Sequence, residues 1–365
     1  MRLRRKQKEF VEAAANYGSS PSAMFWKRLR RNAMAMGSLA VIALFTIVAI
    51  LGYLITPDHT PYCNQQYLEL ASLKPFSKAT FLCVTNGEGK AEKSCTIISG
   101  KPLDYTATPI ESYIIEGDSI VATPYNGEPI VTTQEKAFIQ TRTFILGTDT
   151  YGRDLLSQVM IGSRVSLSVG FIAVAIALLI GILLGALAAY YGGWVDSLIM
   201  WFINVVWSIP TVLLVIAITF ALGKGFWQVF VAVGLTMWVD VARVVRGQVL
   251  SIKEKEYVEA ARALGYRTPR IILRHILLNI TGPVIVIAAS NFASAILLEA
   301  GLSFLGIGVQ PPMPSWGTMV KENYGQILLD NAHLAFIPGV AIMIIVLAFM
   351  LLGNGIRDAL DIKTQ

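Results

Sequence analysis

Charged residues recur at helical spacing in one short polar stretch, at Glu256, Glu259 and Arg262. Residues three apart lie on the same side of a helix, so this stretch predicts a helix with a charged side. Smaller apolar side chains stand between the charges: Val258, Ala260, Ala261 and Leu264. Small side chains let a helix sit closely in a groove, so the chemistry expected here is binding to a partner protein. The alternative is a helix that lies on its own chain or on the lipid surface.

Motifs for catalysis by the chain itself are missing from the sequence. There is no Gly-x-x-x-x-Gly-Lys-[Ser/Thr] phosphate loop, and the nearest fragment, residues 87–90, lacks the first glycine and the following hydroxyl. His59, His275 and His333 are too scattered for a metal site. A Gly-x-Ser-x-Gly nucleophile motif is also missing. We therefore expect neither enzymatic activity nor a metal or cofactor in this chain.

Long apolar segments must hold the polar stretch in place. Hydrophobic residues make up 54% of the 365 residues and charged residues only 15%, which is too apolar for a soluble protein unless the excess lies in long blocks. A membrane-spanning helix needs roughly 20 apolar residues. Six runs meet this length, and each is expected to cross the membrane as a helix: 33–56, 166–191, 197–222, 226–249, 281–302 and 334–354.

The Lys and Arg residues set the orientation, because cytoplasmic segments of membrane proteins are enriched in them. Nine precede the first run: Arg2, Arg4, Arg5, Lys6, Lys8, Lys27, Arg28, Arg30 and Arg31. Six lie between the fourth and fifth runs: Lys253, Lys255, Arg262, Arg267, Arg270 and Arg274. We therefore expect six spans with both termini in the cytoplasm. The membrane explains the net charge of +6, so no nucleic-acid partner is expected.

The segment between the first two runs, residues 57–165, is the sizeable soluble part and should be extracytoplasmic. Its β-prone runs, separated by Asn-Gly and Gly-Asp turn signals, predict strands at residues 80–84, 95–98, 112–115, 119–122 and 129–133. All three cysteines lie here, on the oxidising side, at Cys63, Cys83 and Cys95. Three pairings are open. A Cys83–Cys95 disulfide with Cys63 free is favoured, and three unpaired thiols are the alternative.

Two acidic residues lie inside the expected spans, Asp240 and Glu299. A proton-coupled carrier needs ionisable groups at mid-membrane depth, whereas both of these lie toward the end of a run. Asp240 precedes Arg243 by three residues, which predicts an ion pair near the cytoplasmic surface. Glu299 lies toward the external end of the fifth run, where capping, gating and substrate contact are all open. Energy for transport is therefore expected to come from another subunit.

The polar stretch belongs to a cytoplasmic loop of about residues 250–279 that should form two short helices. Residues 253–264 are good helix formers, and Gly265 would end this helix in a left-handed cap. Thr268 and Pro269 predict the N-cap and first position of a second helix that runs to Leu278. The expected domain order is a cytoplasmic tail (1–32), the first transmembrane helix (33–56), the external insert with a lead-in segment (57–165), a five-helix core (166–355) and a cytoplasmic tail (356–365).

The loop resembles a known family. Glu259, Ala260, Ala261 and Gly265, followed by isoleucine and leucine at 276–277, look like the EAA motif of ABC-importer permease subunits. Residues 146–157 (LGTDTYGRDLLS) and 162–167 (GSRVSL) resemble the segment before the second span in dipeptide, oligopeptide and nickel importers. Residues 302–317 (LSFLGIGVQPPMPSWG) are similar to the signature after the fifth span of their C-type permease. The resemblance covers about residues 24–55 and 144–361.

The resemblance implies roles for three groups of residues. The ATPase-coupling group is Glu256, Glu259, Ala260, Ala261, Arg262 and Gly265. The group that leads into the second span is Gly147, Asp149, Gly152, Arg153, Asp154 and Ser157. The group at an external gate or docking surface is Gly306, Gln310, Pro311, Pro314, Trp316 and Gly317. The sequence departs from the family pattern at Leu278, where proline is usual, at Gln158, where arginine is common, and in its longer insert.

The implied fold is an all-α polytopic membrane protein of the type I ABC-importer permease type, with a β-rich insert between its first two helices. The implied partners are a second, B-type permease, two cytoplasmic ATPase subunits that bind ATP and Mg, and an extracytoplasmic substrate-binding protein. Such a complex lies in the bacterial inner membrane. Di- or oligopeptides are the favoured substrate and nickel chelates the main rival. A peptide or drug exporter subunit and a membrane scaffold that presents the insert are further alternatives.

Overall fold

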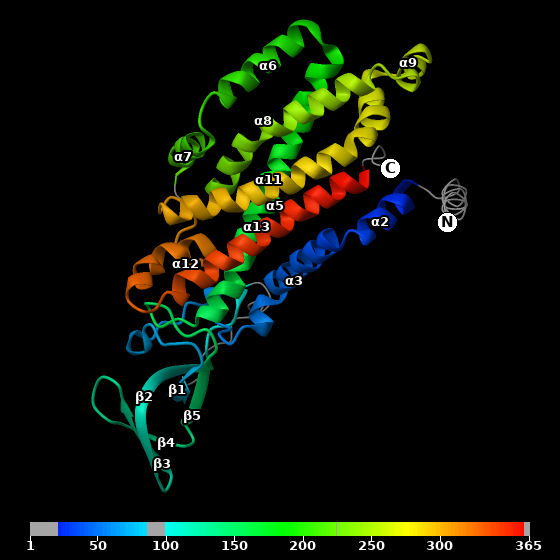
Figure 1. The fold of residues 1–365 in the computed structure, drawn as a ribbon. Helices are drawn as coiled ribbons and strands as arrows, with labels where there is room; N and C mark the ends of the chain where they lie inside the picture. The colour runs from blue at the N-terminus through cyan, green and yellow to red at the C-terminus, as the bar shows by residue number, and fades with distance from the viewer. Residues whose placement is uncertain (1–20, 86–98, 224, 361–365) are drawn as a thin grey trace, which may run out of the picture.

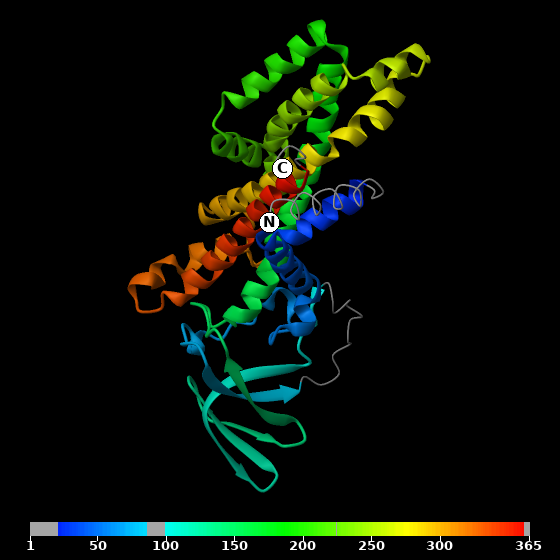
Figure 2. The same ribbon diagram turned by 45° about the vertical axis from the view of Figure 1, so that its right-hand side comes forward.

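The computed structural model describes residues 21–85, 99–223 and 225–360. Long helices run along most of the molecule, and a small β-sheet projects from one end of the bundle (Figure 1). A view turned by 45° shows the same separation of sheet and helices (Figure 2). The strands in the described part all lie between residues 77 and 144.

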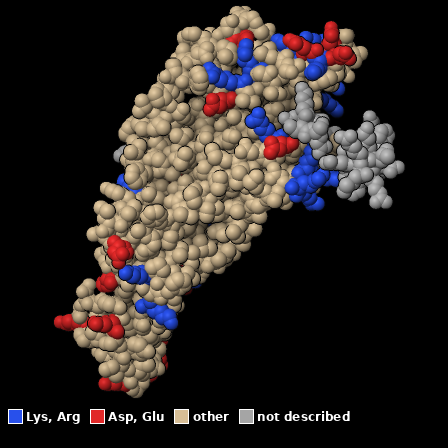
Figure 3. Space-filling model, in the orientation of Figure 1, with Lys and Arg blue, Asp and Glu red and all other residues tan. Residues whose placement is uncertain are grey.

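Within the described residues, five helical stretches are long and apolar enough to cross a membrane. They are α3 (Ala33–Ile55), α5 (Leu155–Tyr191), α8 (Phe226–Ile252), the stretch Thr268–Phe304 that contains α11 (Thr281–Phe304), and α13 (His333–Leu360). On the face shown in Figure 3, charged side chains gather at the two ends of the molecule and leave a broad, nearly uncharged band between them. A band of this kind is what a bilayer requires of the surface that it covers.

The predicted single helix over residues 197–222 is wrong. The chain forms two helices there, α6 (Gly193–Trp207) and α7 (Thr211–Leu222), which are bent by 91° at a short break. Pro210 occupies the N-cap position of α7. Proline lacks an N–H donor and clashes with the preceding helical turn, so an apolar run that contains it need not be one helix. The two helices together could still account for one crossing.

The second apolar run belongs to a helix that starts earlier than predicted, at Leu155 instead of residue 166. Asp154 is its N-cap, and the carboxylate accepts a hydrogen bond from the Ser157 backbone N–H at 2.8 Å. Burial raises the pKa of Asp154, although its hydrogen bonds from Ser157 act in the opposite direction. The shorter helices are α2 (Pro21–Arg31), α9 (Glu256–Ala263), α10 (Thr268–Arg270) and α12 (Trp316–Asn323).

Glycines set the close approach of α5 and α8. A Cβ atom added at Gly181 would lie 2.7 Å from the Trp238 carbonyl oxygen, and one added at Gly185 would lie 2.5 Å from the Ala242 carbonyl oxygen. The Gly181-x-x-x-Gly185 spacing thus forms the small-residue seam that membrane helices use for close packing. A large buried cluster, which includes Val233 and Val241, surrounds this seam.

Gly185→Ala should therefore destabilise the protein by about 1–3 kcal/mol, because the added methyl group forces α5 and α8 apart. Gly247→Ala is the matched control, since Gly247 lies on α8 and an added Cβ atom would meet no other element of the described chain within 4 Å. That control should be neutral or slightly stabilising, because alanine favours a helix interior over glycine by roughly 0.5–1 kcal/mol. Thermal unfolding of the detergent-solubilised variants measures both effects. Equal unfolding temperatures for the two alanine variants would contradict the seam.

The sheet has five strands in the order β4-β3-β2-β1-β5, and all its neighbouring pairs are antiparallel. The strands are β1 (Ser77–Thr85), β2 (Tyr105–Glu116), β3 (Ser119–Pro124), β4 (Ile130–Thr133) and β5 (Ala137–Phe144). Phe81 and Leu82 of β1 point to opposite faces, and both are buried, so each face of the sheet carries a small core. Four of the five predicted β-prone runs overlap these strands, and the run at 95–98 lies outside the described residues.

The cysteines are described only in part. Cys63 and Cys83 are both buried, and they form no disulfide with each other. Cys83 lies in the central part of β1, whereas Cys95 lies outside the described residues. The proposed Cys83–Cys95 disulfide therefore stays a prediction.

Candidate functional site

The helix α9 lies at the end of the bundle away from the sheet (Figure 1). Its inner side is formed by Val258 and Ala261, which are buried and pack into the main core cluster of the same chain. Glu259 and Ala260 remain exposed on its outer side. The sequence predicts that the apolar side of α9 binds a partner protein. In the structure, part of that side packs against the same chain instead. The outer side, with charges and a small residue, remains open to a partner.

Gly265 ends α9 as the sequence predicts. Its φ is +74°, a left-handed conformation that glycine adopts without strain. The Gly265 N–H donates to the Arg262 carbonyl at 2.9 Å, and the Tyr266 N–H donates to the Ala261 carbonyl at 3.1 Å. These two bonds form a Schellman motif, so the predicted cap is confirmed. Among the described residues other than its two chain neighbours, no atom lies within 4 Å of a Cβ added at Gly265, so backbone conformation is what requires glycine there.

The predicted second short helix, from Thr268 to Leu278, is not separate. The chain continues from α10 through a π-helical turn, Ile271–Ile276, and a 3-10 turn, Leu277–Ile280, directly into α11. Arg267 rather than Thr268 holds the N-cap position, without a side-chain cap bond. Since leucine at position 278 keeps its N–H, where the family usually has proline, helical structure can run on. The cap at Gly265 therefore connects α9 to one helical stretch that runs from Thr268 to the end of α11 at Phe304.

The residues that lead into α5 form a buried junction. Asp149 accepts backbone N–H bonds from Tyr151 and Arg153 at 2.9 Å each, and it pairs with Arg153 Nε at 2.6 Å. Arg153 Nη2 reaches Glu322 of α12, also at 2.6 Å. Burial lowers the pKa of Arg153, but Asp149 and Glu322 outweigh it and raise that pKa above its usual value. The motif therefore ties the segment before α5 to α12.

The two glycines of the same motif are required by close approach. Gly147 has φ +81° and Gly152 has φ +74°. A Cβ atom at Gly147 would overlap the Leu73 carbonyl oxygen, and one at Gly152 would overlap the Tyr67 carbonyl oxygen. Gln158, which stands where the family commonly has arginine, donates to the backbone carbonyls of Tyr62 and Cys63. These contacts position the chain where it enters α5.

The signature after α11 divides into buried and exposed parts. Trp316 is fully buried and donates to the Val159 carbonyl of α5 at 2.9 Å. A Cβ atom at Gly317 would lie 2.7 Å from Ala300, so this glycine also serves packing. Pro314 is buried as well, whereas Pro311 is exposed. A partner that docks on the surface can therefore meet Pro311 but not the buried members of the predicted group.

The other members of that group lie at the turn after α11. Gly306 has φ +78° and Gln310 donates to the Gly306 and Gly308 carbonyls at 3.3 and 2.9 Å. Glu299, nearby in α11, is fully buried and accepts hydrogen bonds from Ser303 at 2.7 Å and Ser166 at 3.3 Å. Because Ser166 belongs to α5, Glu299 joins two helices. This arrangement favours a structural role for Glu299 over direct contact with substrate.

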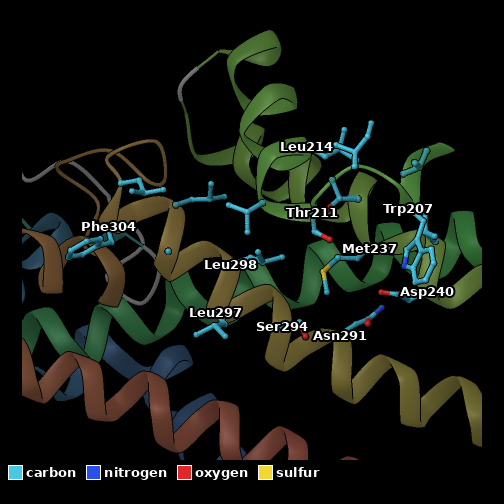
Figure 4. Close-up of a pocket in the computed structure, with 18 residues that line it drawn as sticks. Trp207, Thr211, Leu214, Met237, Asp240, Asn291, Ser294, Leu297, Leu298 and Phe304 are labelled. Carbon is cyan, nitrogen blue, oxygen red and sulfur yellow. The ribbon is translucent and has the colours of Figure 1, made fainter. Parts of the chain in front are cut away.

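A cavity of about 650 Å³ lies beside the break between α6 and α7, and α8 and α11 form its other walls (Figure 4). Asp240, Asn291 and Ser294 place polar groups in a wall that is otherwise largely apolar. The predicted Asp240–Arg243 pair is wrong: Arg243 Nη2 donates to Asn204 Oδ1 of α6 at 3.0 Å. Sequence reasoning missed Asn291, because a single asparagine in an apolar helix has no motif around it.

Comparison with known proteins gives two family matches. Residues 177–365 match the family described as binding-protein-dependent transport system inner membrane component. Residues 20–75 match the N-terminal transmembrane domain of oligopeptide transport permease C. The chain belongs to the binding-protein-dependent transport family. It is a multi-pass protein of the bacterial inner membrane and a permease component of a transport system.

Two curated relatives agree with this assignment. The chain is 42% identical over 220 residues to the glutathione transport system permease protein GsiD of Pectobacterium atrosepticum, which covers 60% of this chain and 73% of the relative. It is also 42% identical to the dipeptide transport system permease protein DppC of Alkalihalophilus pseudofirmus, over 60% of this chain and 72% of that protein. A chain of the inward-facing MetNI methionine ABC transporter aligns with a TM-score of 0.48 and 20% identity, over 57% of this chain and 98% of its own length.

The larger family match contains α8, α9, α11 and the cavity between α6, α8 and α11. The smaller match contains α2 and α3. The five strands lie between the two matched ranges, so the sheet is an addition to the matched parts of this binding-protein-dependent permease.

Proposed function

We propose that this chain is the C-type permease subunit of an ATP-driven importer of di- or oligopeptides. The observation that carries this proposal is the geometry of α9. It is a short helix with an exposed charged side, and a left-handed cap joins it to the stretch that continues into α11. The relatives named for dipeptide and glutathione transport support peptides as the substrate class. Catalysis of ATP hydrolysis belongs, on this proposal, to partner subunits.

The proposed topology has six crossings and places both ends of the chain in the cytoplasm. The helix α2 packs against the end of α13, through Leu29, Ile356 and Ala359, at the same end of the bundle as α9 (Figure 1). The α6–α7 pair would make the crossing between α5 and α8. The sheet would then lie outside the cytoplasm, at the opposite end. Basic residues near α2 and α9 agree with this orientation.

The proposed complex contains two cytoplasmic ATPases that bind ATP and Mg, and α9 would be the contact of this chain with them. A B-type permease would complete the path through the lipid bilayer. An external binding protein would deliver substrate, with Gly306, Gln310 and Pro311 at the gate or docking surface. When ATP closes the ATPases, α9 moves and α8 and α11 tilt with it. ATP must favour one state by about 5.5 kcal/mol to shift a 1:99 equilibrium to 99:1.

Copurification of the complex from native membranes, followed by reconstitution, tests the proposal. We expect a second permease, ATPases with phosphate loops, and ATP-driven uptake of labelled alanine peptides into vesicles. Uptake of a nickel chelate in place of peptides would favour the rival substrate. Outward flux would indicate an exporter. Recovery of this chain alone, with no flux, would favour a scaffold that presents the sheet.

Charge reversal at Glu259 tests α9 as the ATPase contact. Glu259→Lys should reduce the amount of copurified ATPase about tenfold. The substitution reverses the charge at an exposed position of α9, so a partner surface complementary to the glutamate would be repelled by the lysine. Glu111→Lys makes the same charge change on an exposed residue of β2, at the other end of the molecule, and should leave the yield unchanged. Quantitative mass spectrometry of the purified complex measures both. An undiminished ATPase yield with Glu259→Lys would count against this face.

A further inference from the structure

Asp240 lies near the middle of α8. The helix α8 runs from Phe226 to Ile252, so Asp240 is about 21 Å from its first residue and about 18 Å from its last at 1.5 Å per residue. The helix continues three residues beyond the predicted run, so Asp240 lies nearer to its middle than the sequence indicates. An ionisable side chain within a membrane-spanning helix is expensive and is characteristic of a pathway for substrate or ions.

No cation of this chain neutralises Asp240 in the described structure. Arg243, one turn away, lies with its guanidinium over the Trp207 ring at 3.8 Å and donates to Asn204. Those two contacts hold the guanidinium at α6, and no ion pair to Asp240 forms among the described residues. Asp240 is exposed and lines the 650 Å³ cavity, so its carboxylate is open to a ligand.

Asn291 supplies a second, independent observation. It lies on α11 across the cavity, and only 4% of its surface is exposed. Its Nδ2 is buried and has no hydrogen-bond partner among the described residues. Figure 4 shows the Asn291 amide and the Asp240 carboxylate directed toward the same part of the cavity. A buried amide donor without a partner costs roughly 1–3 kcal/mol, so a ligand acceptor at this place would relieve the cost.

The two groups match the amino end of a peptide. An ammonium group donates hydrogen bonds and carries the positive charge that a carboxylate needs. The first peptide carbonyl follows two bonds later and accepts a hydrogen bond. The remaining walls, including Met237, Leu297 and Leu298, are largely apolar and can cover side chains of different kinds. A cavity of this volume lies in the range of small-molecule sites.

We propose that Asp240 and Asn291 bind the amino end of the peptide during its passage, with the Asp240 carboxylate on the ammonium group and the Asn291 amide on the first carbonyl. This inference rests on the proposed peptide import and names the substrate group that the permease itself recognises. It makes the cavity selective for a free amine, separately from any selection by the external binding protein.

The experiment uses the complete complex in proteoliposomes, with labelled dialanine, trialanine and tetraalanine as probes. Asp240→Asn should lower the initial rate of ATP-driven uptake about tenfold or more, because it removes a charge-assisted hydrogen bond. Subunit composition should not change. Asp358→Asn, at an exposed position on α13, is the control and should transport at the wild-type rate. The double variant Asp240→Asn with Asn291→Asp moves the carboxylate across the cavity and should recover much of the lost uptake.

Each outcome bears on the inference. Wild-type uptake by Asp240→Asn would overturn it and leave the proposed import standing. Loss of the second permease from the Asp240→Asn complex would also overturn it, because the carboxylate would then serve subunit assembly. Failure of the double variant to recover uptake would contradict a carboxylate that acts on the ligand. Absence of ATP-driven uptake of all three peptides by the wild type would overturn the proposed function and this inference together.

Discussion

Replacing Arg153 by methionine should destabilise the protein by about 3–5 kcal/mol, the usual cost of removing one partner from a buried ion pair. The guanidinium bridges Asp149 and Glu322, both at 2.6 Å, and only 6% of Arg153 is exposed. Methionine fills a similar volume but leaves two carboxylates without their cation. The loss should separate the segment before α5 from α12, and thus loosen the end of the bundle next to the sheet.

Lys74→Met is the matched control for Arg153. Lys74 pairs with Asp330 at 3.3 Å, but the two side chains are 71% and 93% exposed. Exposed pairs contribute about 0–1 kcal/mol, so this substitution should have little effect on stability. Arg153→Lys keeps the charge but loses the planar fork that reaches both carboxylates, so it should fall between methionine and wild type. Thermal unfolding in detergent measures the series. If the Arg153→Met protein unfolds at the same temperature as the wild type, the stability of the junction does not depend on the ion pairs of Arg153.

The long helices follow from the sequence because a bilayer imposes both their length and their apolar surface. Five of the six predicted runs correspond to such helical stretches. The predictions failed at two places where individual residues, not the length or hydrophobicity of an apolar run, determine where a helix begins or breaks. Pro210 marks the break between α6 and α7. Asp154 with Ser157 is an N-cap pair, and it places the start of α5 before the apolar run begins.

The candidate site was predictable only where one short stretch of chain determines it. The cap at Gly265 depends on its immediate neighbours, so the sequence predicts it and the structure confirms it. The surroundings of Asp240 depend on distant elements. Arg243 turns to Asn204, which is far away in the sequence, and the partnerless amide of Asn291 comes from another helix. Spacing within one helix favoured the wrong pair because it contains no information about α6 or α11.

Valine at position 265 should leave ATP hydrolysis intact and lower ATP-driven peptide uptake about tenfold. Gly265 has φ +74°, a conformation that costs a residue with a side chain roughly 1–2 kcal/mol, and β-branched residues more. Space is not the limit, because a Cβ added at Gly265 would meet no atom within 4 Å in the described part of the chain beyond its two neighbours. The valine variant must therefore change the backbone of the cap. That change would shift α9 relative to the stretch leading into α11. ATP hydrolysis would then be uncoupled from the movement of the transmembrane helices.

Gly265→Asn distinguishes this backbone effect from any effect of size. Asparagine, like valine, adds a side chain at position 265, but it tolerates the left-handed conformation far better than valine does. Gly265→Asn should therefore retain most of the uptake. Initial uptake and ATP hydrolysis are measured together in proteoliposomes for both variants and the wild type. If valine and asparagine reduce uptake equally, a side chain at position 265 obstructs the partner and the cap geometry is not the cause. If neither reduces it, the link from α9 to α11 does not carry the movement that ATP drives.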